Sequence, residues 1–240
     1  AFKSNLGSLV YMTIQPFLYY AFLVVGISYS IGPVVYKGMK MPYAAYAAIG
    51  VIGLIMTMQM SNAVYRSTVD KQFGLMAIKF ISGVKPYYYL IGMSSFPIMG
   101  YLYQCLILYV ILIFTGISSY VPFFIVAVII GMVMLVFWSS LGIICSTLFK
   151  NYQQRDIVLQ LVFSPIAFTA PSFYLDGAGP KYLTFLANIN PLTYQLRALR
   201  SIAYGNWNTS IIIFSLIPTV VIFIIACFIL KRMKLTLQER

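Results

Sequence analysis

The stretch from Val121 to Phe149 reads VPFFIVAVIIGMVMLVFWSSLGIICSTLF and holds no charged residue over its 29 positions. A helix of about 20 apolar residues can cross the hydrocarbon core of a bilayer, because each residue adds about 1.5 Å. Five more apolar runs occur, and the 16 basic and four acidic side chains all lie outside the six runs. The other runs are Ile14–Tyr36, Tyr43–Tyr65, Tyr87–Phe114, Ile157–Leu175 and Thr209–Leu230.

The composition of the chain agrees with this pattern, since 61% of its residues are hydrophobic and its mean hydropathy is +0.90. Lipid offers the backbone no hydrogen-bond partner, so a spanning segment must be a helix or a strand of a closed barrel. The runs are continuous and do not alternate, which disfavours a barrel. We therefore predict an all-α polytopic membrane protein with six transmembrane helices, in which residues 1–240 form a single transmembrane domain.

The positions of the basic residues predict the orientation of the chain. With a cytoplasmic N-terminus, 11 of the 16 Lys and Arg residues fall in cytoplasmic segments and five fall outside. Cytoplasmic loops carry an excess of Lys and Arg, so we predict that both termini are cytoplasmic. The net charge of +12 does not predict nucleic-acid binding, because these charges are spread over short loops of a membrane protein. Membrane lipids are the expected contacts.

Two segments on the cytoplasmic side are predicted to be interfacial. Residues 1–15 are expected to form an interfacial helix that turns into the first span near Pro16. Residues 66–86, between spans 2 and 3, carry apolar residues at helical spacing opposite several lysines, which is typical of an amphipathic helix in the membrane plane. Such a helix is either held at the surface by anionic lipid or used as a docking element for a cytosolic partner.

On the outer side, residues 176–208 are too long for a tight connection between spans 5 and 6. Asn190 is a plausible N-cap and Pro191 a plausible first residue for a helix that begins there. Two short re-entrant helices that dip into the outer leaflet fit this segment, and an ordinary extracellular loop with one surface helix is the alternative.

The sequence lacks the residues that several classes of membrane protein require. There is no histidine, and none of the four acidic residues lies in a predicted span. A proton-coupled carrier needs an ionisable group inside the membrane. A metal site needs clustered ligands, and an intramembrane protease needs a nucleophile with its base. No Walker-type G-x-x-x-x-G-K-[ST] loop is present. We therefore expect no enzyme activity, no bound cofactor and no metal, and a transporter of this kind needs a partner that supplies energy.

Three motifs make the chain resemble the membrane subunits of ABC type-2 exporters, in particular the daunorubicin-resistance and nodulation lipo-oligosaccharide branch. Asn190–Tyr194 (NPLTY), followed by Arg197–Arg200 (RALR), is similar to the family motif between spans 5 and 6. Thr13–Pro16 (TIQP) is similar to the entry into the first span. Residues 70–84 resemble the segment E-R-E-x-G-T-L-E…T-P-V, with Asp70, Ala77 and Gly83 departing from it.

The resemblance implies an ATP-driven exporter of a hydrophobic or amphipathic substrate such as a drug, lipid, peptide or lipid-linked glycan. It implies a dimer with a second permease copy or paralogue, and a separate ABC ATPase subunit that holds ATP and Mg²⁺. A prokaryotic plasma membrane is the expected location. A stand-alone channel or secondary carrier is the alternative, and a non-transporting scaffold or immunity-type protein is a third reading.

Three groups of residues are the candidate sites. For coupling to the ATPase, lysines would pair with acids of the partner and aromatics would bury apolar area; these residues are Asp70, Lys71, Phe73, Gly74, Met76, Lys79 and Phe80. For the outer gate they are Asn190, Pro191, Tyr194 and Arg197. Polar side chains within spans 2 and 5 either line the translocation path or join helices to one another; these are Gln59, Asn62, Gln160, Ser164 and Thr169.

Overall fold

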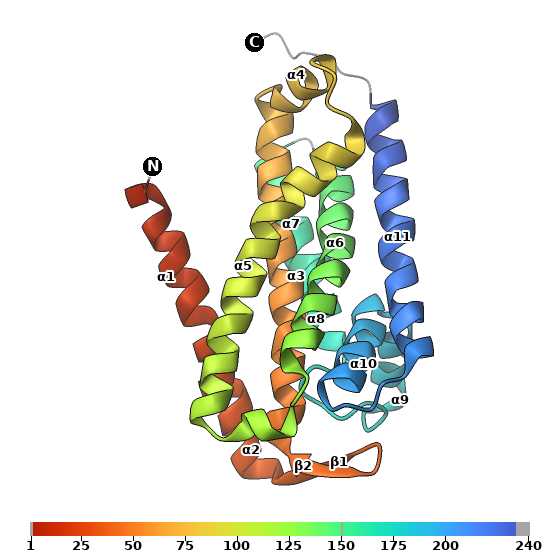
Figure 1. Ribbon diagram of the computed structural model, residues 1–240. Coiled ribbons are helices and arrows are strands. Elements are labelled where there is room, and N and C mark those ends of the chain that lie inside the picture. Colours follow the sequence, from red (N-terminus) through yellow and green to blue (C-terminus); the bar gives the residue numbers. More distant parts are fainter. Residues whose placement is uncertain (1, 150, 234–240) are drawn as a thin grey trace.

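The computed structural model describes residues 2–149 and 151–233, which form a helical bundle with a β-hairpin at one end (Figure 1). The longer helices are α1 (Phe2–Leu18), α3 (Tyr43–Gln72), α5 (Pro86–Phe114), α6 (Phe124–Leu148), α10 (Pro191–Ala203) and α11 (Thr209–Arg232). The shorter helical elements are η1 (Tyr19–Val25), α2 (Gly26–Ile31), α4 (Leu75–Ile81), η2 (Ile117–Tyr120), α7 (Tyr152–Val158), η3 (Leu159–Phe163), α8 (Ser164–Thr169) and α9 (Lys181–Ile189). Strands β1 (Pro33–Tyr36) and β2 (Met39–Pro42) form the antiparallel hairpin.

Helix α3 is the centre of the bundle. Every residue from Tyr43 to Thr57 is buried, and α3 packs against α5, α6 and α10. A helix that is apolar on all sides must be covered on all sides, either by protein or by lipid. Here protein covers it, and the helices around it carry the apolar residues that remain exposed, such as Phe22, Ile125 and Phe228.

Within residues 2–149 and 151–233, five helical segments are long and apolar enough to cross a membrane: Leu9–Ile31, α3, α5, α6 and α11. The polytopic helical class is thus confirmed. The fifth predicted run, Ile157–Leu175, is helical only as far as Thr169, in the continuous series α7, η3 and α8. The chain from Ala170 to Pro180 is irregular. The sixth span therefore stays a prediction.

The predicted turn near Pro16 is wrong, because α1, η1 and α2 follow one another as a continuous helix from Phe2 to Ile31. Proline removes one backbone hydrogen bond, but a helix in lipid has no other partner for its remaining groups, so it continues. At the far end of the same run, Pro33–Tyr36 is a strand and not part of the helix. The fold is thus not entirely α-helical.

The hairpin follows from its loop residues. Lys37 and Gly38 both have positive φ, at 47° and 82°, and Tyr36 pairs with Met39 across them. A two-residue loop with two positive φ values matches the twist of the flanking strands, and glycine adopts this conformation without strain. The hairpin packs its Val34, Tyr36 and Met41 into the main core at the end of α3.

The irregular segment after α8 lies directly against α3. A Cβ atom on Gly50 would lie 1.9 Å from the carbonyl oxygen of Ser172, closer than any real contact. Tyr43 and Tyr46 donate hydrogen bonds to the carbonyls of Phe173 and Tyr174 in the same segment. Glycine at position 50 is therefore needed so that this backbone can pass beside the central helix.

We expect Gly50→Ala to lower the thermal unfolding temperature of the detergent-solubilised chain, because overpacking of this kind costs about 1–3 kcal/mol. Gly26→Ala is the matched control, since nothing lies within 4 Å of the Cβ that it adds. Alanine favours a helix over glycine by about 1 kcal/mol, so the control should be neutral or slightly stabilising. Equal unfolding temperatures for the two variants would contradict the close approach at Gly50.

Candidate functional site

The first candidate site is the end of the bundle where α3, α4 and α5 meet. Helix α3 ends at Gln72, and Gly74 adopts φ 70° before α4 begins at Leu75. This left-handed conformation favours glycine and reverses the chain. The single amphipathic helix predicted over residues 66–86 is therefore wrong: residues 66–72 belong to α3, α4 contains only seven residues, and α5 begins at Pro86.

Helix α4 is apolar on two opposite faces. Its inner face, with Met76 and Ala77 buried, packs on α5, where the Phe80 ring lies 5.3 Å from that of Tyr89. Met76 and Phe80, expected to contact a partner, thus face the chain's own core. The outer face and the preceding turn expose other apolar side chains: Phe73, Leu75, Ile78 and Ile81.

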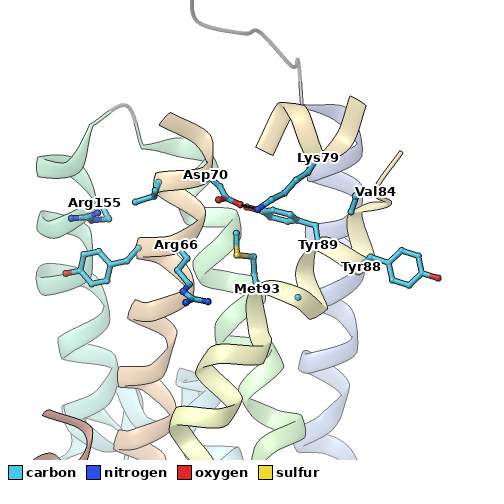
Figure 2. A pocket seen from close by; sticks show the side chains of 11 residues that line it. Arg66, Asp70, Lys79, Val84, Tyr88, Tyr89, Met93 and Arg155 are labelled. Carbon is cyan, nitrogen blue, oxygen red and sulfur yellow. Dashed lines mark hydrogen bonds and ion pairs between the residues drawn. The ribbon is translucent and has the colours of Figure 1, made fainter. Parts of the chain in front are cut away.

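Asp70 fixes α4 in place. Its side chain is 11% exposed, forms an ion pair with Lys79, and accepts a hydrogen bond of 3.1 Å from the Tyr89 hydroxyl. The Lys79 ammonium also lies 5.4 Å from the centre of the Tyr89 ring. Figure 2 shows these three side chains meeting between α3, α4 and α5. One carboxylate thus joins three helices.

Lys71 has a different local role. Its ammonium donates to the carbonyl oxygens of Thr147 and Phe149 at 2.5 and 2.9 Å. These carbonyls end α6 and have no helical partner, and a cation is favourable at a helix C-terminus. Lys71 and Lys79 therefore both have partners within the chain already.

A cavity of about 590 Å³ opens beside this cluster, between α3, α4, α5 and α7 (Figure 2). Asp70 and Lys79 form part of its wall, together with Arg66 and Arg155. The sequence reasoning missed the two arginines. The sequence did contain an indication for Arg66, because it lies one helical turn before Asp70 and so on the same side of the helix.

The second candidate site lies at the opposite end of the bundle, where α9 and α10 meet the irregular segment. Asn190 caps α10 by accepting from the Leu192 amide at 2.9 Å, and Pro191 occupies the first helical position. The Asn190 amide also donates to the Ile166 carbonyl and the Thr169 hydroxyl, at 2.6 and 3.0 Å. Thr169, which was predicted to line the translocation path, thus lies next to the predicted outer gate.

Tyr194 and Arg197 hold the neighbouring loops. The Tyr194 hydroxyl donates to the Asn188 carbonyl at 2.7 Å. Arg197 makes a two-pronged contact with Asp176, at 2.6 and 2.9 Å, and this hydrogen-bonded carboxylate raises the pKa of the guanidinium. Three of the predicted gate residues therefore join α10 to α8, α9 and the segment before α9, and Pro191 starts α10.

Arg200 is the outer residue whose role the sequence reasoning missed. Its guanidinium is fully buried, lies 3.7 Å from the centre of the Tyr46 ring, and donates to the carbonyls of Pro171 and Ser172. It does not reach out to headgroups. The signal was its spacing, four residues after Leu196, which places it on the apolar face of α10.

The predicted path residues do not form one group. Gln59 donates to Gln104 at 2.7 Å and accepts from Asn62, and Gln104 donates to Gln15 at 2.9 Å. This chain of amides joins α3, α5 and α1. Gln160 is exposed and Ser164 half-buried on η3 and α8. Gln59 thus joins α3 to α5, which is one of the two expected roles, and Asn62 supports Gln59 from the same helix.

Comparison with known families decides the class of the protein. The family model for the ABC-2 type transporter matches residues 2–204. The chain belongs to the ABC-2 transporter membrane family. This family supplies the permease component of ABC transporters and normally pairs with an ATPase subunit. Comparison with curated proteins finds no match.

We expect Asp70→Asn to loosen α4 in this permease, because Lys79 loses its ion pair and buried polar groups lose a partner, at about 1–3 kcal/mol. Hydrogen exchange of amides 75–81 should become faster. Asp156→Asn is the control, since its carboxylate is 46% exposed and such pairs contribute about 0–1 kcal/mol. Unchanged exchange in α4 would show that Asp70 does not hold it.

Arg200→Lys should lower the unfolding temperature of the permease more than Arg197→Lys. Lysine cannot stack flat on Tyr46 or present a planar fork of donors. The buried stack and the hydrogen bonds of Arg200 together contribute about 2 kcal/mol or more to the free energy of unfolding. Arg197 sits in a partly exposed ion pair that lysine can retain. Thermal unfolding in detergent measures both, and the reverse order would refute the structural role of Arg200.

Proposed function

We propose that this permease is the transmembrane subunit of an ATP-driven exporter in a prokaryotic plasma membrane. ATP and Mg²⁺ are held by a separate ATPase subunit, and the substrate is hydrophobic or amphipathic. The observation that carries the proposal is a docking patch, formed by Phe73, Leu75, Ile78 and Ile81, at the end of the bundle. A contiguous exposed apolar patch marks an interaction surface.

The placement of the docking patch supports a cytosolic partner. Basic residues gather at this end, namely Arg66, Lys71, Lys79, Lys85, Arg155, Lys231 and Arg232. Among the described residues fewer occur at the hairpin end, and by the positive-inside rule this distribution supports a cytoplasmic α4. Since α4 is held by Asp70 and by its buried face, movement of a docked ATPase passes directly to α3 and α5.

The burial of α3 supports a path between two copies of the permease. A helix that is buried throughout its first half fills the interior of one bundle, so a single copy has no room for a pore along its axis. We propose that a second copy or a paralogue completes the path. The same observation disfavours the stand-alone channel.

At the other end, we propose that α9 and α10 cover the exit as re-entrant helices, in the manner of the daunorubicin-resistance and nodulation branch. Asn190, Tyr194 and Arg197 link these helices to α8 and to the segment before α9. Because these links run between separate elements, opening of the exit breaks or moves them together. Gln160 on η3 and Ser164 and Thr169 on α8 are the proposed path contacts.

The test is co-purification of a Walker-type ATPase with the full chain from its native membrane. We expect Phe73→Asp with Ile81→Asp to remove the ATPase while the permease remains folded, because both side chains are about two-thirds exposed. Phe80 is unsuitable because its ring packs on Tyr89. Tyr182→Asp is the control, since Tyr182 is 69% exposed on α9 at the other end.

An ATPase that stays bound to the double variant would show that the patch faces lipid or another partner. A wild-type chain that purifies without any ATPase and conducts in liposomes without ATP would refute the exporter and favour the channel.

A further inference from the structure

The cavity beside α4 contains a guanidinium without a counter-charge. Arg66, Lys79 and Arg155 line it, with Asp70 as the acidic residue. Asp70 is paired with Lys79, and Arg155 is paired with Asp156 on its own helix. Within residues 2–149 and 151–233, no carboxylate lies within 4 Å of the Arg66 guanidinium.

Arg66 is nevertheless held in a defined orientation. Its guanidinium lies 4.1 Å from the centre of the Phe96 ring on α5, and Figure 2 shows the side chain extending from α3 toward Met93. It donates no hydrogen bond to the described part of the chain. Arg66 is exposed, so its donors are open to solvent and to a ligand. Arginine presents a planar fork of donors that matches the geometry of a phosphate, so this stacked guanidinium is oriented to bind one.

The rest of the cavity wall is amphipathic. Val69, Val84 and Met93 supply apolar surface. Tyr88 and Tyr65 add aromatic surface, and the Tyr65 ring lies 4.1 Å from the Arg155 guanidinium. A free phosphate ion gains nothing from the apolar part of this wall. A phospholipid has both an anionic head and an apolar body, so its chemistry fits the whole cavity.

We propose that this cavity binds the phosphate headgroup of an anionic phospholipid from the cytoplasmic leaflet, with Arg66 as the main phosphate contact. The site rests on the proposed orientation, in which the α4 end is cytoplasmic. Because Lys79 and Tyr89 form the same wall and also hold α4, bound lipid stabilises the helix that carries the docking patch.

The experiment measures the thermal unfolding of the detergent-solubilised chain during titration with phosphatidylglycerol, phosphatidylcholine or inorganic phosphate. We expect stabilisation by phosphatidylglycerol. Arg66→Gln should weaken its apparent affinity by about tenfold, since a hydrogen bond to a charged group contributes on that scale. Arg66→Lys retains the charge and should recover part of the loss.

Arg232→Gln is the matched control, because Arg232 also stacks at 4.1 Å on an aromatic ring, that of Phe228, but does not line the cavity. It should bind phosphatidylglycerol as the wild type does. Equal losses in Arg66→Gln and Arg232→Gln, or no loss in either, would overturn the site. Equal stabilisation by inorganic phosphate would overturn the lipid as ligand. The assay contains no ATPase, so its outcome does not depend on the exporter proposal.

Discussion

The rest of this structure depends on the complete burial of the first half of α3. Once a helix is covered on all sides, its neighbours must approach closely along its whole length, and small residues permit this. Alanines fill positions 44, 45, 47 and 48, and Gly50 admits the backbone of Ser172. In lipid, close packing replaces the hydrophobic drive between helices, so this contact largely determines how the bundle assembles.

The two ends of the bundle are held by different means. At the hairpin end, Arg200, Tyr43 and Tyr46 donate to backbone carbonyls of the irregular segment, and Asn190 donates to α8, so many contacts fix one surface. At the α4 end, one carboxylate, Asp70, joins three helices. Lys71 and the packed side chains of Met76 and Phe80 add further contacts there. The proposed partner and lipid near α4 would therefore act on several helices together.

Between these ends, the amides of Gln15, Gln59 and Gln104 form a continuous chain across three helices. Each amide in a membrane interior needs a partner, and here the partners are other amides. Such a network fixes which faces of α1, α3 and α5 meet. It accounts for these polar residues in the spans without a substrate.

The sequence by itself determined the polytopic helical class, the long spans α3, α5, α6 and α11, the cap at Asn190 and the start of α10 at Pro191. These features depend on local hydrophobicity and capping chemistry, which are readable along the chain. The sequence did not reveal that the helix continues through Pro16, that the chain reverses at Gly74, or that Met76 and Phe80 face inward. It located Asp70 and Lys79 but not their pairing with Tyr89, and it did not find the roles of Arg66, Arg155 and Arg200. Only the tertiary structure decided these features. Residues distant in sequence determine which side of an apolar helix packs against protein, and they also supply the partner of a charged group.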